Sequence, residues 1–294
     1  MHALVLAVLL ASAQPAVAQE TRSLRLSVFD SKGQPVTNLE AREVAVVENG
    51  VARPVARLSR DDRQIALALV VDTSAAARES YRLQVVPAVV SLLRRLPAGA
   101  RVTVWTSGSR PTRVAERTAA VEDAIAALQR AIPDGGNTLF DTIDAAVADL
   151  TAAEAQRSVL LIVTGTGVEF SSGDRPRVAE DPARLGATEV YAVAIEEGVP
   201  ISEPEDDQEG RSPMERHANY DRALDSLTRQ TGGRLERAFS YMSLAPALDT
   251  ILADLSGGYR LSYSTAAGVA RHEVEVRVAR PKVRLRHAQT SQAD

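Results

Sequence analysis

The sequence predicts an α/β protein. Its core is a doubly wound, mostly parallel sheet, and both chain ends build a small antiparallel β module beside it. Two observations predict this architecture. In the middle of the chain, continuous apolar runs, typical of strands covered on both faces, alternate with stretches of helical periodicity. Toward both ends, apolar and polar residues instead alternate with period two, as in antiparallel strands with one buried face.

The N-terminal part of the module, residues 19–64, has the pattern of strands and hairpins. Apolar side chains recur at every second position, at Leu24, Leu26 and Val28, with Ser and Arg between them, which predicts a half-buried strand. Further along, Asn49-Gly50 lies between two apolar stretches, and this dipeptide favours the positive φ angles of a tight hairpin turn. We therefore expect antiparallel strands on both sides of this turn.

The central domain is predicted to span residues 65–256. Continuous apolar runs predict four of its strands, at residues 65–71, 102–106, 159–164 and 190–195. Between them, apolar residues recur at a spacing near 3.6 and predict helices, for example at Val121, Ile125, Leu128 and Ile132. Pro87 lies inside the predicted helix 78–96, where we expect a kink. This alternation predicts parallel strands with helices on both faces of the sheet.

The last part of the chain, residues 257–294, returns to the period-two pattern. Tyr259, Leu261 and Tyr263 alternate with polar residues, and a second alternating stretch begins at Val274. Both ends of the chain are thus predicted to supply strands to one small β module, a β-sandwich that flanks the central domain.

The first eighteen residues carry the features of a signal peptide. Residues 3–13 form an apolar run too short to span a bilayer, and Ala16-Val17-Ala18 places small residues where a signal peptidase reads the chain. We expect cleavage after Ala18 and export of residues 19–294 to the periplasm or the cell exterior. No later segment has the ~18 consecutive apolar residues of a membrane helix, so we expect no membrane span.

Composition argues against several classes of function. The chain has 34 basic and 38 acidic residues and a net charge of −4, a balance not expected of a nucleic-acid-binding protein. Because it has no cysteine, it cannot form disulfides, thiolate metal sites or a cysteine nucleophile. It also has no G-x-S-x-G elbow, no H-E-x-x-H zinc motif and no P-loop. We therefore expect a protein that is not an enzyme.

Polar residues follow the predicted parallel strands. Asp72-Thr73-Ser74 comes directly after the first strand, Gly135-Gly136-Asn137-Thr138 precedes a helix, and Thr164 and Thr166 lie at the end of a later strand. In a doubly wound sheet, ligands bind beyond the carboxyl ends of the strands, which share one edge. We therefore expect these three segments to meet there and to form a shallow binding pocket.

These segments resemble the von Willebrand factor type A (VWA) family in both order and spacing, over roughly residues 65–255. The shared features are an apolar strand ending in Asp-x-Ser, a GG-x-T-x-x-D helix start and a later strand ending in Thr. The PV-x-x-L turn, the VxENG hairpin and the GGYRLSYS strand of the flanking regions are similar to those of exported bacterial VWA-related proteins. The resemblance therefore extends over the whole chain after residue 18.

The resemblance implies a metal-ion-dependent adhesion site, which in this family holds Mg²⁺. Asp72, Ser74 and Thr138 match the family's D-x-S-x-S motif and its threonine. Ala76 stands where the family has the second serine, and Gly165 stands where it has a loop aspartate. The site is therefore degenerate, lacking one oxygen ligand and one negative charge. Since Mg²⁺ affinity depends on both, binding should be weak or absent unless a neighbour substitutes; the candidates are Thr164, Thr166, Asp141 and Glu79.

The resemblance also implies an exported, adhesion-like module that binds an unidentified partner protein over this pocket. In the family, a carboxylate of the ligand completes the coordination of the metal. The side chains that we expect to contact the partner are Thr73, Asn137, Thr164 and Thr166. Without a metal, backbone N–H groups at the helix starts would receive an anion instead.

A structural interpretation of the same residues stays open. Ser74 would cap the helix that follows it, and Thr138 with Asp141 would form a capping box. Asp72 would be stabilised by the positive end of the helix after it. The chain would then be a metal-independent scaffold or assembly component whose adhesion site is inactive.

Overall fold

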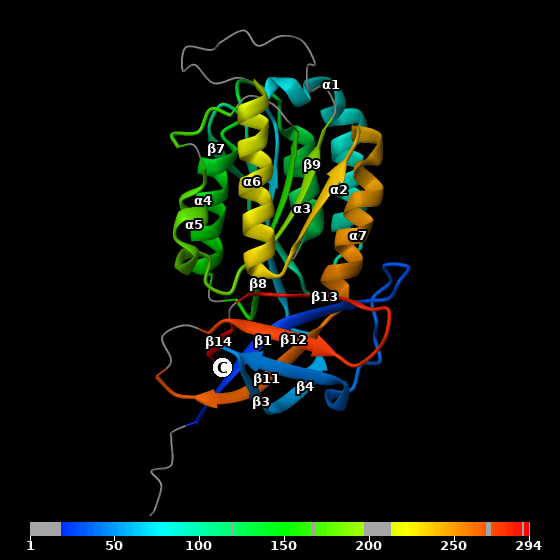
Figure 1. Ribbon diagram of the computed structural model, residues 1–294. Coiled ribbons are helices and arrows are strands. Elements are labelled where there is room, and N and C mark those ends of the chain that lie inside the picture. The colour runs from blue at the N-terminus through cyan, green and yellow to red at the C-terminus, as the bar shows by residue number, and fades with distance from the viewer. Residues whose placement is uncertain are drawn as a thin grey trace, which may run out of the picture.

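The computed structural model describes residues 19–118, 120–153, 155–165, 169–173, 175–196, 213–268, 272–289 and 291–293. The predicted signal peptide, residues 1–18, and Thr166 lie outside the described residues. An α/β domain stands on a small β module, and the chain passes from the module into the domain and back (Figure 1). Within the described part, no helix is both long enough and apolar enough to cross a membrane.

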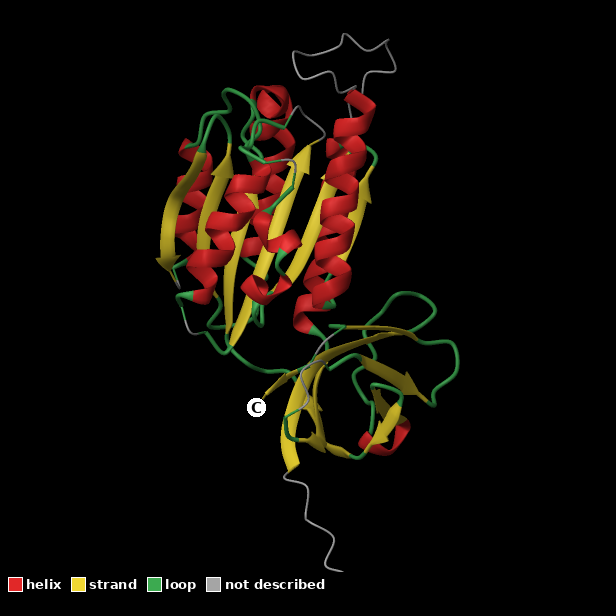
Figure 2. Cartoon of the chain, turned by 60° about the vertical axis from the view of Figure 1, so that its left-hand side comes forward, coloured by secondary structure: helices red, strands yellow, loops and turns green. Residues whose placement is uncertain are grey.

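The central sheet has six strands in the order β10-β9-β8-β5-β6-β7. Five run parallel, and β7 is antiparallel to β6 at one edge (Figure 2). The strands are β5 (Ile65–Val71), β6 (Arg101–Ser107), β7 (Pro111–Thr118), β8 (Arg157–Gly165), β9 (Glu189–Ile195) and β10 (Arg234–Ala238). The prediction of a mostly parallel sheet is confirmed. The two edge strands, β7 and β10, were not predicted, because they carry charged residues and have no continuous apolar run.

Helices cover both faces of this sheet. One face packs against α2 (Val86–Leu93), α3 (Val121–Arg130) and α7 (Leu244–Ser256). The other packs against α4 (Leu139–Thr151), α5 (Arg177–Glu180) and α6 (Pro213–Thr231). Along β5, successive side chains enter these two cores in turn: Leu67 and Leu69 enter the first, and Ala68 and Val70 the second. The continuous apolar run of the sequence is thus a strand that is buried on both faces.

At Pro87, where the sequence predicted a kink, the structure has an irregular helical segment. The chain forms η2 (Ala75–Ala77), α1 (Arg78–Ser80) and the π-helical turn η3 (Tyr81–Val85) before α2 begins, with Pro87 in the first turn of α2. Proline has no N–H group to donate to the carbonyl four residues earlier. A wider π turn directly before Pro87 absorbs this missing hydrogen bond within one continuous helical segment.

The β module contains two small sheets. The first has the order β13-β1-β11-β4, with β14 beside β1, and the second has the order β12-β2-β3. The strands are β1 (Gln19–Phe29), β2 (Val44–Glu48), β3 (Val51–Arg53), β4 (Val55–Arg60), β11 (Tyr259–Ala266), β12 (Val274–Val278), β13 (Arg284–His287) and β14 (Gln292–Ala293). Strand β1 pairs with β11, so Leu24 lies opposite Leu261. The predicted turn at Asn49-Gly50 is confirmed, with positive φ at both residues.

A buried carboxylate lies in the core of the module. Tyr263 Oη donates a 2.7 Å hydrogen bond to Glu48 Oε1, and His272 Nδ1 lies 2.6 Å from the same oxygen. Thr265 and Arg53 donate to Glu48 Oε2. Burial alone would raise the pKa of Glu48, but the hydrogen bonds from Thr265, Tyr263 and His272 outweigh it and lower the pKa to about 2. Glu48 therefore joins β2 to β11 and to the segment before β12 as a charged group.

Glu48 should make the stability of the protein depend on pH. Because its pKa is lower in the folded state, its stabilisation is complete above its ordinary pKa of 4.5 and is lost as the pH falls toward about 2. Between pH 7 and pH 3, the wild type should lose about 2 kcal/mol more unfolding free energy than Glu48→Gln. Urea unfolding at both pH values measures this difference. Glu273→Gln, at an exposed site nearby, should lose as much as the wild type; equal losses in all three proteins would contradict the role of Glu48.

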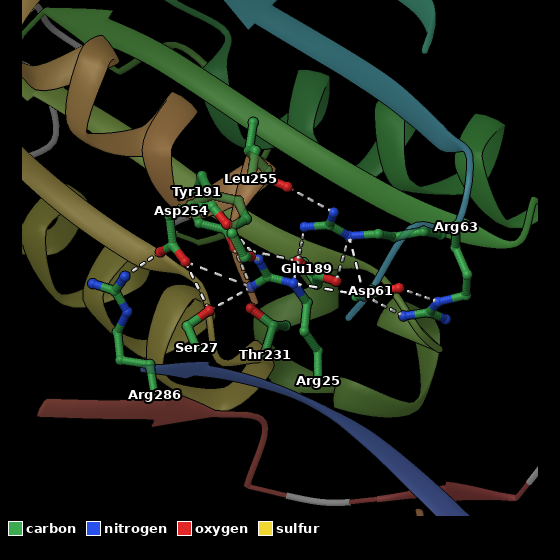
Figure 3. A network of polar contacts seen from close by, with 12 residues as sticks. Arg25, Ser27, Asp61, Arg63, Glu189, Tyr191, Thr231, Asp254, Leu255 and Arg286 are labelled. Carbon is green, nitrogen blue, oxygen red and sulfur yellow. Dashed lines mark hydrogen bonds and ion pairs between the residues drawn. The ribbon is translucent and has the colours of Figure 1, made fainter. Parts of the chain in front are cut away.

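The polar face of β1 is buried too, which corrects the prediction of a half-buried strand. Arg25 and Ser27 point from β1 toward the base of the α/β domain, the edge where its parallel strands begin (Figure 3). Arg25 Nη1 donates to Ser27 Oγ at 2.6 Å and to Tyr191 Oη at 3.0 Å. Its Nη2 donates to the carbonyls of Asp254 and Gly257. The period-two pattern could not show this, because the second face is covered by a separate part of the fold.

More ion pairs surround Arg25 at this junction. Arg157 donates from Nε and Nη2 to the Glu189 carboxylate, both at 3.0 Å, and Arg63 makes a two-bond pair with Asp61. Burial alone would lower the pKa of Arg25, but the carboxylates of Glu189, Asp254 and Asp61 raise it well above its ordinary value. Arg25 therefore stays charged although it is buried. A cavity of about 420 Å³ opens beside this network, between the module and the base.

Candidate functional site

Three loops meet at the edge where β5 and β8 end and α4 begins. The amide of Asp72, directly after β5, donates to the Val163 carbonyl of β8 at 2.9 Å. The amide of Ala75 donates to the Gly135 carbonyl of the loop before α4, also at 2.9 Å. The structure thus brings together the three segments that the sequence predicted would meet, at the upper edge of the domain in Figure 2.

The carboxylate of Asp72 lies at the centre of the three loops. Its Oδ1 accepts from the Ser74 amide at 2.7 Å, while its Oδ2 accepts from the Gly165 amide at 3.0 Å and from Asn137 Nδ2 at 3.2 Å. Burial raises the pKa of Asp72 above its ordinary value, and the bonds from Ser74 and Gly165 offset only part of that rise. Both oxygens therefore accept hydrogen bonds from the protein itself. Oδ1 is bonded within its own loop, and Oδ2 is bonded to the other two loops.

The side chains expected to contact a partner are mostly buried beneath this edge. Asn137 Nδ2 also donates to Thr164 Oγ1 at 3.1 Å, and Thr164 Oγ1 donates to the Gly165 carbonyl at 3.0 Å. Thr73 is buried as well, and its carbonyl accepts from the amide of Asp134. Thr73, Asn137 and Thr164 therefore hold the loops to one another and present almost no surface.

The predicted capping interactions are wrong. The Thr138 hydroxyl donates to the Gly108 carbonyl at 3.1 Å, and the Ser74 hydroxyl makes no bond to the helix after it. Asp141 accepts from the amide and hydroxyl of Ser172. The first turn of α4 is capped from the loop after β8, where Ser171 Oγ accepts from the Asp141 amide at 3.0 Å.

The half-buried carboxylate of Glu169, from the same loop, holds the residue that makes this cap. Burial raises the pKa of Glu169, and the Ser171 amide, which donates to Glu169 Oε1 at 2.8 Å, offsets part of the rise. The amide of Asp141 is therefore occupied by Ser171 Oγ and is not available to an external anion. The sequence could not show this cap, because the capping residues come some thirty positions after the helix start.

The residues at this edge do not fit a Mg²⁺ ion. Ala76 supplies no oxygen ligand. Gly165 has no side chain, and a Cβ at this position would lie 3.1 Å from Tyr241 Oη and 3.3 Å from Asp72 Oδ2, so little room is left for one. The residues proposed as substitutes do not supply the missing ligands. Thr164 and Asp141 are hydrogen-bonded to other groups, as described above, and Glu79 is exposed. Among the described residues there is also no group of three His, Cys, Asp or Glu that could hold a metal.

We therefore expect Mg²⁺ and Mn²⁺ to leave the thermal unfolding of this protein unchanged. A site with a dissociation constant of ~1 mM would raise the unfolding free energy by about 1.4 kcal/mol at ~10 mM metal. Melting curves with ~10 mM metal and with excess EDTA should instead coincide within about 0.3 kcal/mol. A VWA domain with all five motif residues is the positive control. Stabilisation of this chain at millimolar metal would contradict the assignment.

Large apolar side chains are exposed around this edge. Of the six exposed large apolar side chains among the described residues, five belong to loops or helical turns at this edge, and they are 63–81% exposed. We call these five the apolar rim: Leu83, Ile132, Phe170, Phe239 and Met242. The sixth is Val51 in the β module. Sequence reasoning missed the rim, although the run Phe239-Ser-Tyr-Met242 directly after β10 is a detectable signal of apolar residues in a loop.

A mixed six-stranded sheet between two helical layers, with an Asp-x-Ser loop at its carboxyl edge, is the arrangement of the VWA fold. The chain belongs to the von Willebrand factor type A domain family, whose model matches residues 66–234. The resemblance noted from the loop motifs is thereby confirmed at the level of the family.

Several solved structures are similar to this chain. Proximal thread matrix protein 1 from the mussel byssus has 13% identity and a TM-score of 0.49, covering 78% of this chain and 50% of its own. A von Willebrand factor type A protein from Catenulispora acidiphila has 11% identity and a TM-score of 0.49, covering 94% and 74%. The vWF domain of the pilus tip protein Mfa5 from Porphyromonas gingivalis has 9% identity and a TM-score of 0.47, covering 65% and 94%. The chain thus spans about half the length of the mussel protein, and no curated protein matches it.

Proposed function

We propose that this chain is an exported, non-enzymatic protein-binding module, and that the apolar rim docks a partner protein without a metal ion. The observation that carries the proposal is the concentration of exposed apolar side chains at one edge of the domain, the edge where ligands bind in doubly wound sheets. Export rests on the predicted signal peptide at residues 1–18.

The chemistry of the rim favours a protein partner. Phe239 and Met242 are about four-fifths exposed, and Phe170 is almost two-thirds exposed. Docking would remove this apolar surface from water, at about 25 cal/mol for each square ångström. Aromatic and methionine side chains are also enriched in protein interfaces. The hydrogen bonds that Asp72 accepts from Ser74, Gly165 and Asn137 join the loops beneath the rim, so that little ordering is needed on binding.

Capture experiments with rim variants test the proposal. Phe239→Gln/Met242→Gln removes two exposed side chains, while Val51→Gln is a matched control that removes an exposed apolar side chain from the β module. A partner should be cross-linked by the wild type and by Val51→Gln, and its yield should fall at least tenfold with the double variant, in EDTA as in Mg²⁺. Equal yields from the double variant and Val51→Gln would contradict docking at the rim. A yield that disappears in EDTA would contradict metal independence.

A scaffold without a docking function is the second candidate. It is favoured by the observation that both carboxylate oxygens of Asp72 accept hydrogen bonds that join the loops. This candidate predicts that the rim double variant and the wild type assemble into the same complexes.

A further inference from the structure

A second groove lies at the junction of the two parts of the molecule, between the edge of the central sheet and the β module (Figure 1). It has a volume of about 370 Å³. One wall is edge strand β10 with the end of α6, and the opposite wall is β13 with Phe29 and Gly33. The walls meet at one end, where a side chain at Gly232 would lie within 2.4 Å of the backbone at His287 and Ala288.

The lining of the groove has more arginines than carboxylates, although the whole chain is acidic. The groove is lined by five arginines and only two carboxylates: Arg229, Arg234, Arg237, Arg284, Arg286, Asp225 and Glu236. Four of these arginines are paired with carboxylates. Arg284 is exposed and makes no ion pair within the described part of the chain.

The arginines of the groove also lie close enough to affect one another. The pKa of Arg234 lies below its ordinary value, first because of burial and then because Arg286 and Arg284 add positive charge nearby. An anion placed between the two walls would relieve this repulsion and would pair with Arg284, the arginine of the lining that has no ion pair among the described residues.

The backbone of β10 offers a second, independent recognition element. Strand β10 ends the sheet and pairs only with β9, in parallel. On its other side no strand of the described residues pairs with it. Such an edge presents unpaired N–H and C=O groups in a row, and extended peptides bind edges of this kind as an added strand. The groove follows this edge over consecutive residues, from Gly233 to Arg237.

We propose that this groove binds an extended acidic peptide segment of a partner protein, which adds as a strand along β10 and pairs its carboxylates with Arg284 and its neighbours. Leu235 and Leu285, on opposite walls, would contact the apolar side chains of such a peptide. The net charge of −4 gives the whole molecule no general attraction for polyanions, so recognition depends on the groove itself. This surface is distinct from the apolar rim, and its test is independent of the proposed function.

Fluorescence anisotropy with labelled peptides tests this proposal on the full mature chain. The probe is an eight-residue peptide of alternating Glu and Val. Arg284→Gln should weaken its binding about fivefold, and Arg229→Gln/Arg284→Gln about twentyfold, because each removes a charge-assisted contact. Arg57→Gln, at an exposed site on β4, is the matched control and should change binding less than about twofold.

Three further probes separate strand addition from general charge attraction. A Lys-Val peptide should not bind, and an N-methylated Glu-Val peptide should bind at least tenfold more weakly, because it cannot pair with a strand edge. Equal affinity of the N-methylated peptide would overturn strand addition. Equal affinity of a single-stranded oligothymidine of the same charge would make the groove a general polyanion site and overturn the proposal. Wild-type and Arg284→Gln proteins with the same affinity, or no binding at ~1 mM peptide, would overturn it as well.

Discussion

Replacing Arg25 with methionine is expected to lower the free energy of unfolding by about 4 kcal/mol. Arg25 lies between the β module and the base of the α/β domain, where it donates to Ser27, Tyr191 and two carbonyls. Its removal would leave Asp254, Glu189 and Asp61 as buried carboxylates with less compensating charge. Breaking a buried ion network by removing one partner costs more than the intact network contributes, because the remaining charges stay desolvated.

Urea unfolding at neutral pH, followed by circular dichroism, measures this effect. Arg57→Met is the matched control: Arg57 is exposed on β4 of the same sheet, and its loss should change the unfolding free energy by less than about 0.5 kcal/mol. Equal stability of the two variants would contradict this prediction. It would mean that water solvates the remaining carboxylates and that the junction does not depend on Arg25.

The second large effect is expected for Asp72→Ala, at about 3 kcal/mol. This change removes the acceptor of three buried donors, the amides of Ser74 and Gly165 and the side-chain amide of Asn137. Buried donors without acceptors cost about 1–3 kcal/mol each, although the loops will relax to recover part of this. Asp72→Asn keeps one acceptor oxygen and should lose about half as much.

The same measurement distinguishes a structural from a metal-binding role for Asp72. The loss should be equal in EDTA and in Mg²⁺, because the carboxylate is engaged by the protein's own donors. Asp134→Ala is a suitable control, since the Asp134 side chain is exposed in the same loop region and makes a surface ion pair with Arg78. A loss of stability that occurs only in Mg²⁺ would contradict the structural role.

The interior of the fold could be predicted because its strands have a simple signature. A strand such as β5 is buried on both faces, so all seven of its residues are apolar. The edge strands β7 and β10 could not be found in the same way, because one side of each faces solvent or charged groups and the sequence there resembles a loop. The burial of Arg25 depends on contact with Tyr191 and Asp254, far along the chain, and no local pattern records such a contact.

The location of the site could be predicted, but its hydrogen bonding could not. Strand ends fix where Asp72 and Thr164 lie, because the carboxyl ends of parallel strands share an edge. The spacing of Thr138 and Asp141 fits a capping box, yet their side chains bond to Gly108 and to Ser172 instead. Which partner such a side chain bonds to depends on the positions of the surrounding loops to within a few ångströms. The spacing of residues in the sequence does not determine these positions.

The pairing of β1 with β11 has a consequence for how the protein folds. Leu24 and Leu261 are adjacent in the sheet but more than two hundred residues apart in the chain. Closing so long a loop is entropically unfavourable, so contacts of this kind form slowly unless intervening structure has already brought the two strands together. The α/β domain supplies that structure, since it begins beside β4 and ends beside β11. Strand β1 is synthesised before the α/β domain, so it pairs with β11 only after that domain has been made, and its apolar side chains lack their partner strand until then.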